Sequence, residues 1–308
     1  DILAQRQQIE GRRQAWVETG LLRLRKSGTD GMSTLNGWEM PMVAWIPRDY
    51  DGPQFVHVDR VMLNAGRLAA FDPAFFGSRS LDDLPDVARF GQLGAAAVRA
   101  DVDGQGTDLV QRYDASGWRA QSARGYNLGT GHDGDDFGRD IGLTGVGMPV
   151  TNLAGALRWS RTAEDDTRWS LQLQRRPVTG SLLSYAGAHD PLSGRTWGGV
   201  VLSSAILSAS RDTASGWALS ASASAGLYTG KNVASNRRLQ ARVAAGRDVW
   251  RSERQRIYAG LNLSGTLHAR DLSEYSWGHG GYYSPRRSLA LSLPLEWTGR
   301  EGAWAWRL

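Results

Sequence analysis

The residues best suited to chemistry are the five histidines. His189 lies beside Asp190, and His279 lies in a glycine-rich segment. The other three are His57, His132 and His268. A serine nucleophile needs a histidine base and an orienting group, but the sequence has no G-x-S-x-G elbow, no H-E-x-x-H motif and no phosphate-binding glycine loop. We therefore predict that the chain is not an enzyme.

Metal and cofactor chemistry has equally little support. Asp133, Asp135 and Asp136 form an acidic cluster of the kind that can hold calcium, but we favour a solvated acidic loop. The absence of cysteine excludes thiolate metal sites, a cysteine nucleophile and disulfides. Glycoside hydrolysis needs two carboxylates facing each other across a cleft, and nothing marks such a pair among the 31 acidic residues. We predict no metal and no cofactor.

Arginine dominates the charge of the chain. Only Lys26 and Lys231 are lysines, so 34 of the 36 basic residues are arginine, and the net charge is +5. The arginines are spread along the whole chain and mixed with carboxylates, and no nucleic-acid-binding module is recognisable. We therefore interpret them as a polar surface and predict no nucleic-acid partner.

The elements that position these side chains follow a two-residue period from Ala15 onward. In 217–228, one face carries tryptophan, leucine and alanine, and the other is mainly serine and glycine. The same alternation occurs in 168–176, 237–249, 256–268 and 289–297. Strands with two chemically different faces produce this pattern. No run approaches the ~18 apolar residues of a transmembrane helix, so a helical membrane protein is excluded.

Two features favour a membrane barrel over a soluble β-sandwich. The candidate strands are close in length to the ~9–11 residues that cross a bilayer at a tilt. Their apolar faces end in tryptophan at 159, 169, 217 and 297, as an interfacial aromatic girdle would. The polar faces carry arginine and glutamine suited to a water-filled lumen. We predict an all-β fold, a transmembrane antiparallel β-barrel of the outer membrane with about thirteen or fourteen readable strands.

The predicted strands are separated by loops rich in glycine, aspartate and proline. We place the strands at 15–25, 36–46, 54–67, 89–101, 107–126 (one strand or two), 137–147, 152–162, 165–176, 197–210, 216–228, 237–250, 256–268 and 287–299, with one more starting at Ala303. The main loops are Asp72–Asp86, Asn127–Asp136, Gly187–Arg195 and Gly278–Pro285.

Several motifs in a fixed order resemble those of a known family. They are Gln174–Thr179 (QRRPVT), Ser181–Gly187 (SLLSYAG), Asp190-Pro191, Trp197–Val200 (WGGV), Tyr228–Val233 (YTGKNV) with Asn236, and Gly278–Pro285 (GHGGYYSP). Nearer the start are Arg25, Ser27-Gly28, Gly31–Ser33, Leu35, Glu39 and Pro41. In these motifs the chain resembles the C-terminal domain of cellulose synthase operon protein C, the outer-membrane cellulose-export subunit, over nearly its whole length from Ala15.

The resemblance implies a sixteen-stranded barrel preceded by a periplasmic scaffold of tetratricopeptide repeats. Residues 1–14 would be the linker or the end of that scaffold, and residues 15–308 the barrel. It also implies an exit channel for a β-1,4-glucan made at the inner membrane. Because the family domain continues beyond the point where this chain stops, we expect the barrel to lack its last strands. The segment from Gly104 to Gly142 matches the family poorly.

A glucan exposes hydroxyl groups at its equator and C–H faces above and below, and a channel must bind it weakly enough to release it. Alternation gives these lumen or glucan-contact candidates: Arg168, Gln172, Arg176, Arg238, Arg242, Arg256, Tyr258 and Asn262. They could equally hydrate the lumen and pair with acids on adjacent strands. The loop or gate candidates are His279, Tyr282, Tyr283 and Pro285, for which a tight structural turn is the alternative. We interpret most tryptophans as girdle anchors rather than sugar platforms.

The predicted function is export of cellulose or a related exopolysaccharide across the outer membrane, without catalysis. A substrate-selective porin for small solutes is the first alternative, and a barrel enzyme acting on polysaccharide or lipid is the second. The predicted partners are the glucan in transit, outer-membrane lipid, the periplasmic helical-repeat domain of the same polypeptide and, indirectly, the inner-membrane synthase complex.

Overall fold

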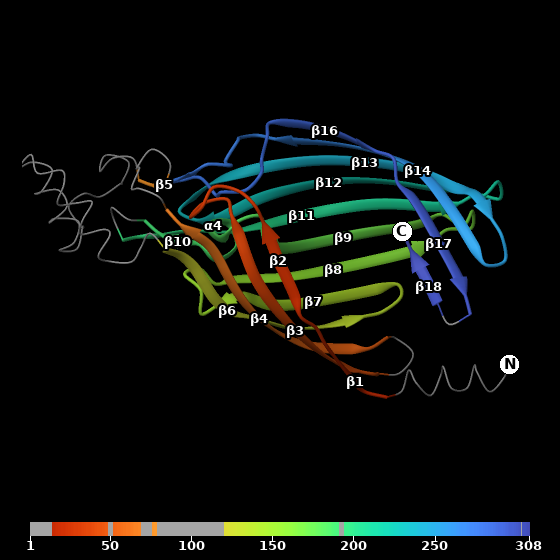
Figure 1. The fold of residues 1–308 in the computed structure, drawn as a ribbon, viewed down its shortest axis with the longest axis horizontal. Coiled ribbons are helices and arrows are strands. Elements are labelled where there is room, and N and C mark those ends of the chain that lie inside the picture. Colours follow the sequence, from red (N-terminus) through yellow and green to blue (C-terminus); the bar gives the residue numbers. More distant parts are fainter. Residues whose placement is uncertain (1–13, 49–51, 69–75, 79–119, 191–193, 303) are drawn as a thin grey trace, which may run out of the picture.

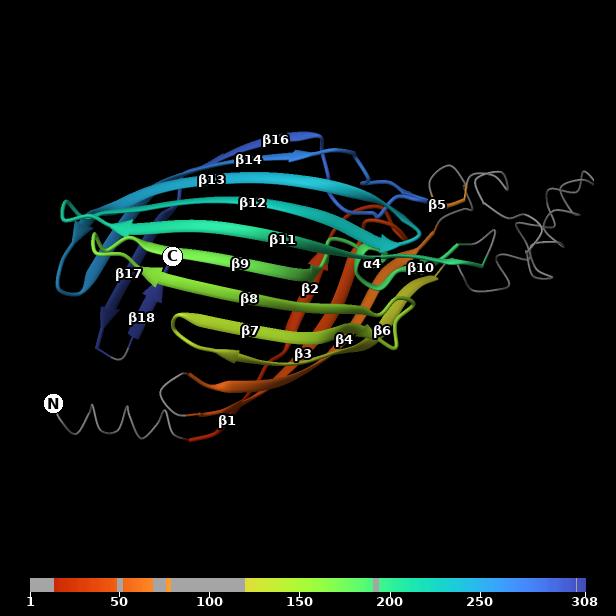
Figure 2. The same ribbon diagram turned by 180° about the vertical axis from the view of Figure 1, so that it is seen from behind.

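One antiparallel sheet takes in most of the chain in the computed structural model, which describes residues 14–48, 52–68, 76–78, 120–190, 194–302 and 304–308. Figures 1 and 2 show the long strands curving around a common interior that holds a short helix. The predicted strand 89–101 and residues 107–119 of the predicted strand segment 107–126 lie outside the described residues, as do residues 1–13 of the predicted linker. Residues 120–126 of that segment lie in the strand β6 (Ala120–Asp133).

Thirteen strands follow one another across this sheet, and short elements are attached to it. The sheet begins with β1 (Trp16–Thr19), β2 (Leu22–Lys26), β3 (Leu35–Ile46), β4 (Gln54–Arg67), β6 (Ala120–Asp133), β7 (Phe137–Val146), β8 (Asn152–Thr162) and β9 (Arg168–Pro177). It continues with β11 (Thr196–Asp212), β12 (Trp217–Lys231), β13 (Val233–Arg251), β14 (Gln255–His268), β16 (Arg287–Ser292), β17 (Leu295–Glu301) and β18 (Trp304–Arg307). The short elements are α4 (Leu182–Ala186), β10 (Ala188–His189), and the parallel pair β5 (Phe76–Gly77) and β15 (Tyr275–Ser276).

The register of the strands separates an apolar outer face from a polar inner face. Ala225 pairs with Leu239, and Leu239 pairs with Leu267, so these three residues share the outer face. Leu239 is 56% exposed and Val243 is 52% exposed. A continuous exposed apolar face of this kind is typical of a sheet that contacts lipid. The chain therefore has the predicted fold class, an outer-membrane β-barrel sheet. No helix in the described ranges is long and apolar enough to span a membrane.

The two ends of the sheet differ in their connections. At one end, the turn end, short hairpins join the strands at 134–136, 163–167, 213–216 and 252–254. At the other, the loop end, the longer connections 178–195 and 269–286 carry α4, β10 and β15. Bacterial barrels have short turns in the periplasm and longer loops outside the cell, so the turn end is the periplasmic end.

The four predicted girdle tryptophans lie on the outer face near the turn end. Trp159, Trp169, Trp217 and Trp297 are 48%, 44%, 39% and 41% exposed. Arg247 lies over the ring of Trp217 at 5.4 Å from its centroid. This is the arrangement of an interfacial anchor, in which the ring meets the apolar band and a polar group faces the headgroups.

The predicted loop Asn127–Asp136 is wrong, because β6 continues to Asp133 and pairs with both β4 and β7. Its glycines are strand residues that make room for larger side chains of β4. A Cβ added to Gly129 would lie 2.2 Å from Nε2 of His57. Glycine in a strand often marks such a close approach, and sequence alone does not separate this role from that of a loop residue.

Two predicted strands are each divided into two at a proline. The segment 15–25 forms β1 and β2, and the break lies opposite Pro41 of β3, which has no N–H to donate. The segment 287–299 forms β16 and β17, and Pro294 lies between them. Its carbonyl oxygen still accepts a hydrogen bond from Gly260 N at 2.9 Å. Each proline removes one ladder hydrogen bond: beside Pro41 the partner strand is divided, and at Pro294 the strand itself is divided.

The two edges of the sheet, β1–β2 and β16–β18, are not paired with each other in the part of the chain that the structure describes. The strand predicted to start at Ala303 is β18, whose described residues begin at Trp304. That further strands complete the barrel stays a prediction.

The assignment of faces is tested by placing the same charge on each side of β13. Ala241 pairs with Ala223 on the outer face, and Ala244 pairs with Ser220 and Asn262 on the inner face. We expect Ala241→Arg to lower the free energy of unfolding in liposomes by about 2–4 kcal/mol, because the charge enters the bilayer. Ala244→Arg should change it little, as measured by denaturant titration. Equal losses in both variants would contradict the assignment.

Candidate functional site on the inner face and at the loop end

The inner face of β9 and β11–β14 carries hydroxyl, amide and guanidinium groups in aligned rows. One row joins Ser170, Ser208, Ser222, Arg242 and Ser264 through successive strand pairs. The next row contains Gln172, Ile206, Ser224, Gln240 and Thr266. Such a surface exchanges hydrogen bonds with a hydroxylated solute at many points, and no single residue dominates the binding.

All eight predicted lumen candidates lie on this inner face, but three of them are engaged with the wall itself. Arg176 makes two hydrogen bonds of 2.6 Å to the carboxylate of Asp140. Arg256 Nε lies 2.5 Å from Oδ1 of Asp248. Asp248 is on β13, next to the β14 of Arg256, as the sequence left open, whereas Asp140 is on β7, two strands from the β9 of Arg176. The two arginines therefore stabilise the wall.

Arg168 holds a turn. Its Nη2 donates to the Asp135 carbonyl oxygen and to Ser160 Oγ, both at 2.9 Å. Arg158 Nη2 likewise donates to Asp133 Oδ1 and to the Gly134 carbonyl oxygen, both at 2.8 Å. The acidic segment 133–136 is thus fastened to β8 and β9. Across the described residues, no group of three or more potential ligand side chains is placed to bind a metal ion.

Of the other five candidates, Arg242 and Asn262 keep their polar groups available to the lumen, whereas Gln172 and Arg238 are hydrogen-bonded to neighbouring glutamines. Arg242 is exposed, and neither its side chain nor that of Asn262 has a hydrogen-bond partner among the described residues. Gln172 donates to Gln174 at 2.9 Å, and Arg238 donates to Gln240. Tyr258 lies beside Arg256, whose guanidinium carbon is 5.5 Å from its ring centroid.

An aromatic ladder on the inner face near the turn end was missed by the sequence analysis. It comprises Trp16, Trp45, Phe55 and His57, from β1, β3 and β4. Trp16 stacks on Trp45 with centroids 5.7 Å apart, Trp45 lies 5.2 Å from Phe55, and Phe55 lies 6.2 Å from His57. The Nε1 of Trp45 is buried and has no hydrogen-bond partner in the described structure. Alternation along β3 was the signal that could have separated Trp45 from the girdle.

The ladder ends beside a charged group of the wall. His57 Nδ1 lies 3.2 Å from Asp59 Oδ2, and both Asp140 and Arg176 act on His57 electrostatically. Arg176 reaches Asp140 across β8, where Ala154 and Ala156 occupy the inner face. Small residues on β6 and β8 therefore form a floor on which the longer side chains of β4 and β9 lie.

At the loop end, α4 folds inward and packs against the inner face of β3 and β4 (Figure 1). Its N-terminus is a capping box, in which Ser184 N donates to Ser181 Oγ at 3.1 Å and Ser181 N donates to Ser184 Oγ at 2.9 Å. All five residues of the helix are buried. The cluster they build with the wall includes Leu35, Val61, Leu63, Met148, Leu182 and Tyr185.

Tyr185 ties the helix to β6. Its Oη accepts a hydrogen bond of 2.8 Å from Asn127 Nδ2, and Asn127 Oδ1 accepts one of 3.1 Å from Gly145 N. Burial raises the pKa of Tyr185 to about 12, and the hydrogen bond from Asn127 opposes only part of this shift. The phenol is therefore held neutral in a closed polar network.

Two further buried clusters lie around Trp197 and around Tyr282. We call the described residues of 76–78, 178–200 and 269–286 the plug. Trp197 is fully buried, and its ring centroid lies 5.2 Å from that of Phe76 and 5.9 Å from that of Trp277. Ser78 donates from its N and its Oγ to the buried Asp190 carboxylate, both at 2.8 Å. Gly198 has φ +98°, and a Cβ there would lie 2.4 Å from the Leu183 carbonyl oxygen, so only glycine fits.

The four gate candidates occupy different environments. Tyr282 is buried and stacks on Tyr228 with centroids 4.6 Å apart, whereas Tyr283 is 79% exposed. His279 Nδ1 lies 2.9 Å from Ser276 Oγ. His268 Nδ1 lies 2.9 Å from the Pro285 carbonyl oxygen, which can only accept. The segment is thus fastened at three of the four positions, and Tyr283 alone of them extends into solvent.

Comparison with known sequences identifies the family. The model of the cellulose synthase operon protein C C-terminus matches residues 33–308. The chain belongs to this family. The motif resemblance is therefore confirmed, and with it the cellulose-related, outer-membrane setting of the domain. Cellulose synthase operon protein C of Escherichia coli K12 is 36% identical over 287 residues, which cover 92% of this chain and 22% of that protein.

A second relative is the Xanthomonas axonopodis pv. citri protein of the same name, 35% identical over 183 residues, 59% of this chain and 12% of that protein. The chain thus spans less than a quarter of the length of these curated relatives. Among solved structures, OmpT of Vibrio cholerae aligns with a TM-score of 0.38 at 11% identity, covering 95% of this chain and 86% of that one.

Several of the motifs that carry the family resemblance meet in the plug or beside it. Ser181–Gly187 is α4 with its caps, and Trp197–Val200 lies against it, with Gly198 next to Leu183. Asn236 is almost fully buried and holds Arg270, donating to its carbonyl oxygen at 2.8 Å and accepting from its N at 2.9 Å. Motifs far apart in this family member therefore build one compact core.

The plug is tested by removing its tie to the wall. Tyr185→Phe leaves Asn127 Nδ2 without its acceptor, so we expect the local free energy of opening of α4 to fall by about 1–3 kcal/mol. Hydrogen exchange of the Tyr185 and Gly187 amides measures this opening. Tyr283→Phe, at an exposed tyrosine, is the matched control and should change nothing. Unaltered protection in Tyr185→Phe would contradict the tie.

High pH should open the plug through the same residue. Because the pKa of Tyr185 is raised from 10.0 to about 12 in the folded state, its contribution is complete below pH 10 and is lost as the pH rises toward 12. Phenolate absorbance of the wild type minus that of Tyr185→Phe should titrate near 12. A midpoint near 10 would show that this phenol is solvated.

Proposed function

We propose that the domain is an outer-membrane channel that passes a cellulose chain, or a related exopolysaccharide, from the periplasm to the cell surface without catalysis. The observation that carries the proposal is the inner face, which offers hydroxyl, amide and guanidinium groups along its rows and an aromatic ladder near the turn end. A scaffold preceding β1 would lie on the periplasmic side, because β1 pairs with the turn-end half of β3.

The ladder and the polar rows match the two kinds of surface on a glucan. The rings of the ladder present faces of the kind that stack on the C–H faces of a sugar. The serine rows and the side chains of Arg242 and Asn262 exchange hydrogen bonds with hydroxyls farther along the wall. Many weak contacts suit a channel, since tight binding at one point would stop the polymer.

The charges of the wall support the same proposal. Arg176, Arg256 and Arg158 are paired with carboxylates of other strands one or two positions away in the sheet. Pairing keeps the lumen polar and reduces the field that a bare arginine lining would create. A neutral polysaccharide needs hydration and hydrogen bonds, whereas a porin selective for anions would benefit from unpaired cations.

An enzymatic role finds one arrangement to consider. Ser276 Oγ lies 2.9 Å from His279 Nδ1 and 3.2 Å from Glu274 Oε2, so the set has the composition of a hydrolase triad. Ser276 is only 2% exposed, within the plug. A nucleophile must reach its substrate, so we interpret these hydrogen bonds as part of the packing of the segment.

The proposal is tested at the ladder. We expect Trp45→Ala to weaken the block of channel current by cello-oligosaccharides about fivefold, the loss of one ring contact of about 1 kcal/mol. In cells, the same change in the full-length protein should lower extracellular cellulose while synthase activity in membranes persists. Trp217→Ala, on the outer face, is the control.

Current that no cello-oligosaccharide blocks, in a folded wild-type channel, would favour the general porin. Normal extracellular cellulose after deletion of the gene would exclude the export role. Hydrolysis of cello-oligosaccharides that is lost in His279→Ala would restore the enzymatic alternative.

A further inference from the structure

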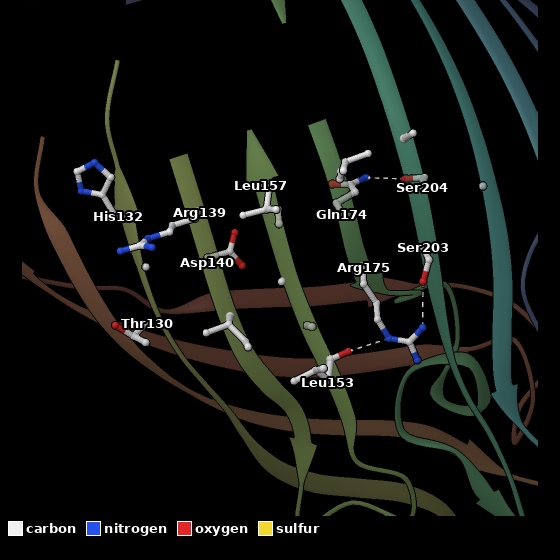
Figure 3. A pocket seen from close by; sticks show the side chains of 18 of the residues that line it. Thr130, His132, Arg139, Asp140, Leu153, Leu157, Gln174, Arg175, Ser203 and Ser204 are labelled. Atoms are coloured by element: carbon white, nitrogen blue, oxygen red, sulfur yellow. Dashed lines mark hydrogen bonds between the residues drawn. The ribbon is translucent and has the colours of Figure 1, made fainter. Parts of the chain in front are cut away.

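The outer face of β7–β12 carries a groove of about 1030 Å³ (Figure 3). Its walls are leucines at 153, 157, 173 and 227, which are 53%, 50%, 48% and 41% exposed. Its floor consists of the small residues Gly155, Ala205 and Ala225. Large side chains beside small ones on a lipid-facing sheet leave a channel of the shape that a hydrocarbon chain fills.

Arg175 lines this groove, on the same outer face. Gly155, Arg175, Ser203 and Leu227 form one row across four strands. The Arg175 Nη1 donates to Ser203 Oγ at 2.9 Å, and its Nε donates to the Leu153 carbonyl oxygen at 3.1 Å (Figure 3). Both bonds hold the guanidinium on the wall and leave Nη2 free to donate.

Among the described residues, no carboxylate is paired with the charge of Arg175. Within the described ranges, Arg175 has no ion-pair partner, in contrast to its sequence neighbour Arg176, which is paired with Asp140 on the inner face. An unpaired cation on a surface that meets lipid is costly unless an anion accompanies it. A phosphate accepts hydrogen bonds from a guanidinium in a fixed geometry and neutralises its charge.

The position of Arg175 along β9 suits a lipid headgroup. Trp169 of the girdle lies six residues earlier on the same strand, which is about 20 Å at the rise of an extended chain. The apolar band of an outer-membrane barrel is about 25 Å tall. Arg175 is two residues from the end of β9 at Pro177. It therefore lies near the margin of the band toward the loop end, where headgroup phosphates of the outer leaflet begin.

We propose that this groove is a binding site for a phosphate-bearing lipid of the outer leaflet, with the phosphate on Arg175 and Ser203 and an acyl chain along the floor of Gly155, Ala205 and Ala225. The site is on the opposite side of the wall from the lumen and is independent of what passes through it. The bound lipid supplies the anion that the protein lacks at this point.

The test uses diphosphoryl lipid A and its dephosphorylated form, added to the folded chain in detergent and detected by native mass spectrometry. We expect the wild type to bind the phosphorylated form about tenfold more tightly, the value of one charge-assisted hydrogen-bonding site. Arg175→Gln should abolish this preference, and Arg161→Gln, at an exposed outer arginine near the turn end, should keep it.

The groove itself is tested on β12 by a matched pair of exposed outer alanines. Ala225→Phe fills the floor and should lower binding of both lipid forms, whereas Ala223→Phe lies outside the groove and should not. If the wild type bound phosphorylated and dephosphorylated lipid A equally well, that result alone would overturn the proposal. Loss of the preference in Arg161→Gln as well would show a diffuse effect of charge and would overturn it too.

Discussion

The interior of a bilayer offers no partner to a backbone N–H or C=O, and this constraint shapes the whole domain. Each strand must satisfy its backbone on its neighbours, so the chain crosses the membrane as one continuous antiparallel ladder. Pairing turns successive side chains to opposite sides. The wall is therefore a single layer with lipid on one side and the lumen on the other, and it has no core of its own.

The buried core of the protein lies instead in the plug. The three buried clusters join α4, Trp197 and Tyr282 to the inner face of the wall at the loop end. Burial is what allows a five-residue helix, far too short to be stable alone, to persist with its capping box. Toward the turn end the same inner face carries the aromatic ladder and the serine rows.

Arginine has different roles on the two faces of the sheet. On the inner face, Arg176 and Arg256 are paired with carboxylates and stabilise the wall, while Arg242 stays available to a solute. Arg175, the residue before Arg176, lies on the outer face and has no ion-pair partner among the described residues. The direction of the side chain decides whether a guanidinium supports the barrel, contacts a polymer or meets a headgroup.

The sequence alone was enough to predict an outer-membrane barrel domain, from its alternation, its lack of cysteine and its ordered motifs. Alternation also assigned the eight lumen candidates to one face. These are local properties, because the period of a strand is set by its own residues. The sequence did not show that β6 continues through Gly129, that Trp45 lies in an aromatic ladder, or that distant motifs meet in one plug. Those features depend on which side chain of a neighbouring strand fills the space, and only the tertiary structure brings the neighbours together.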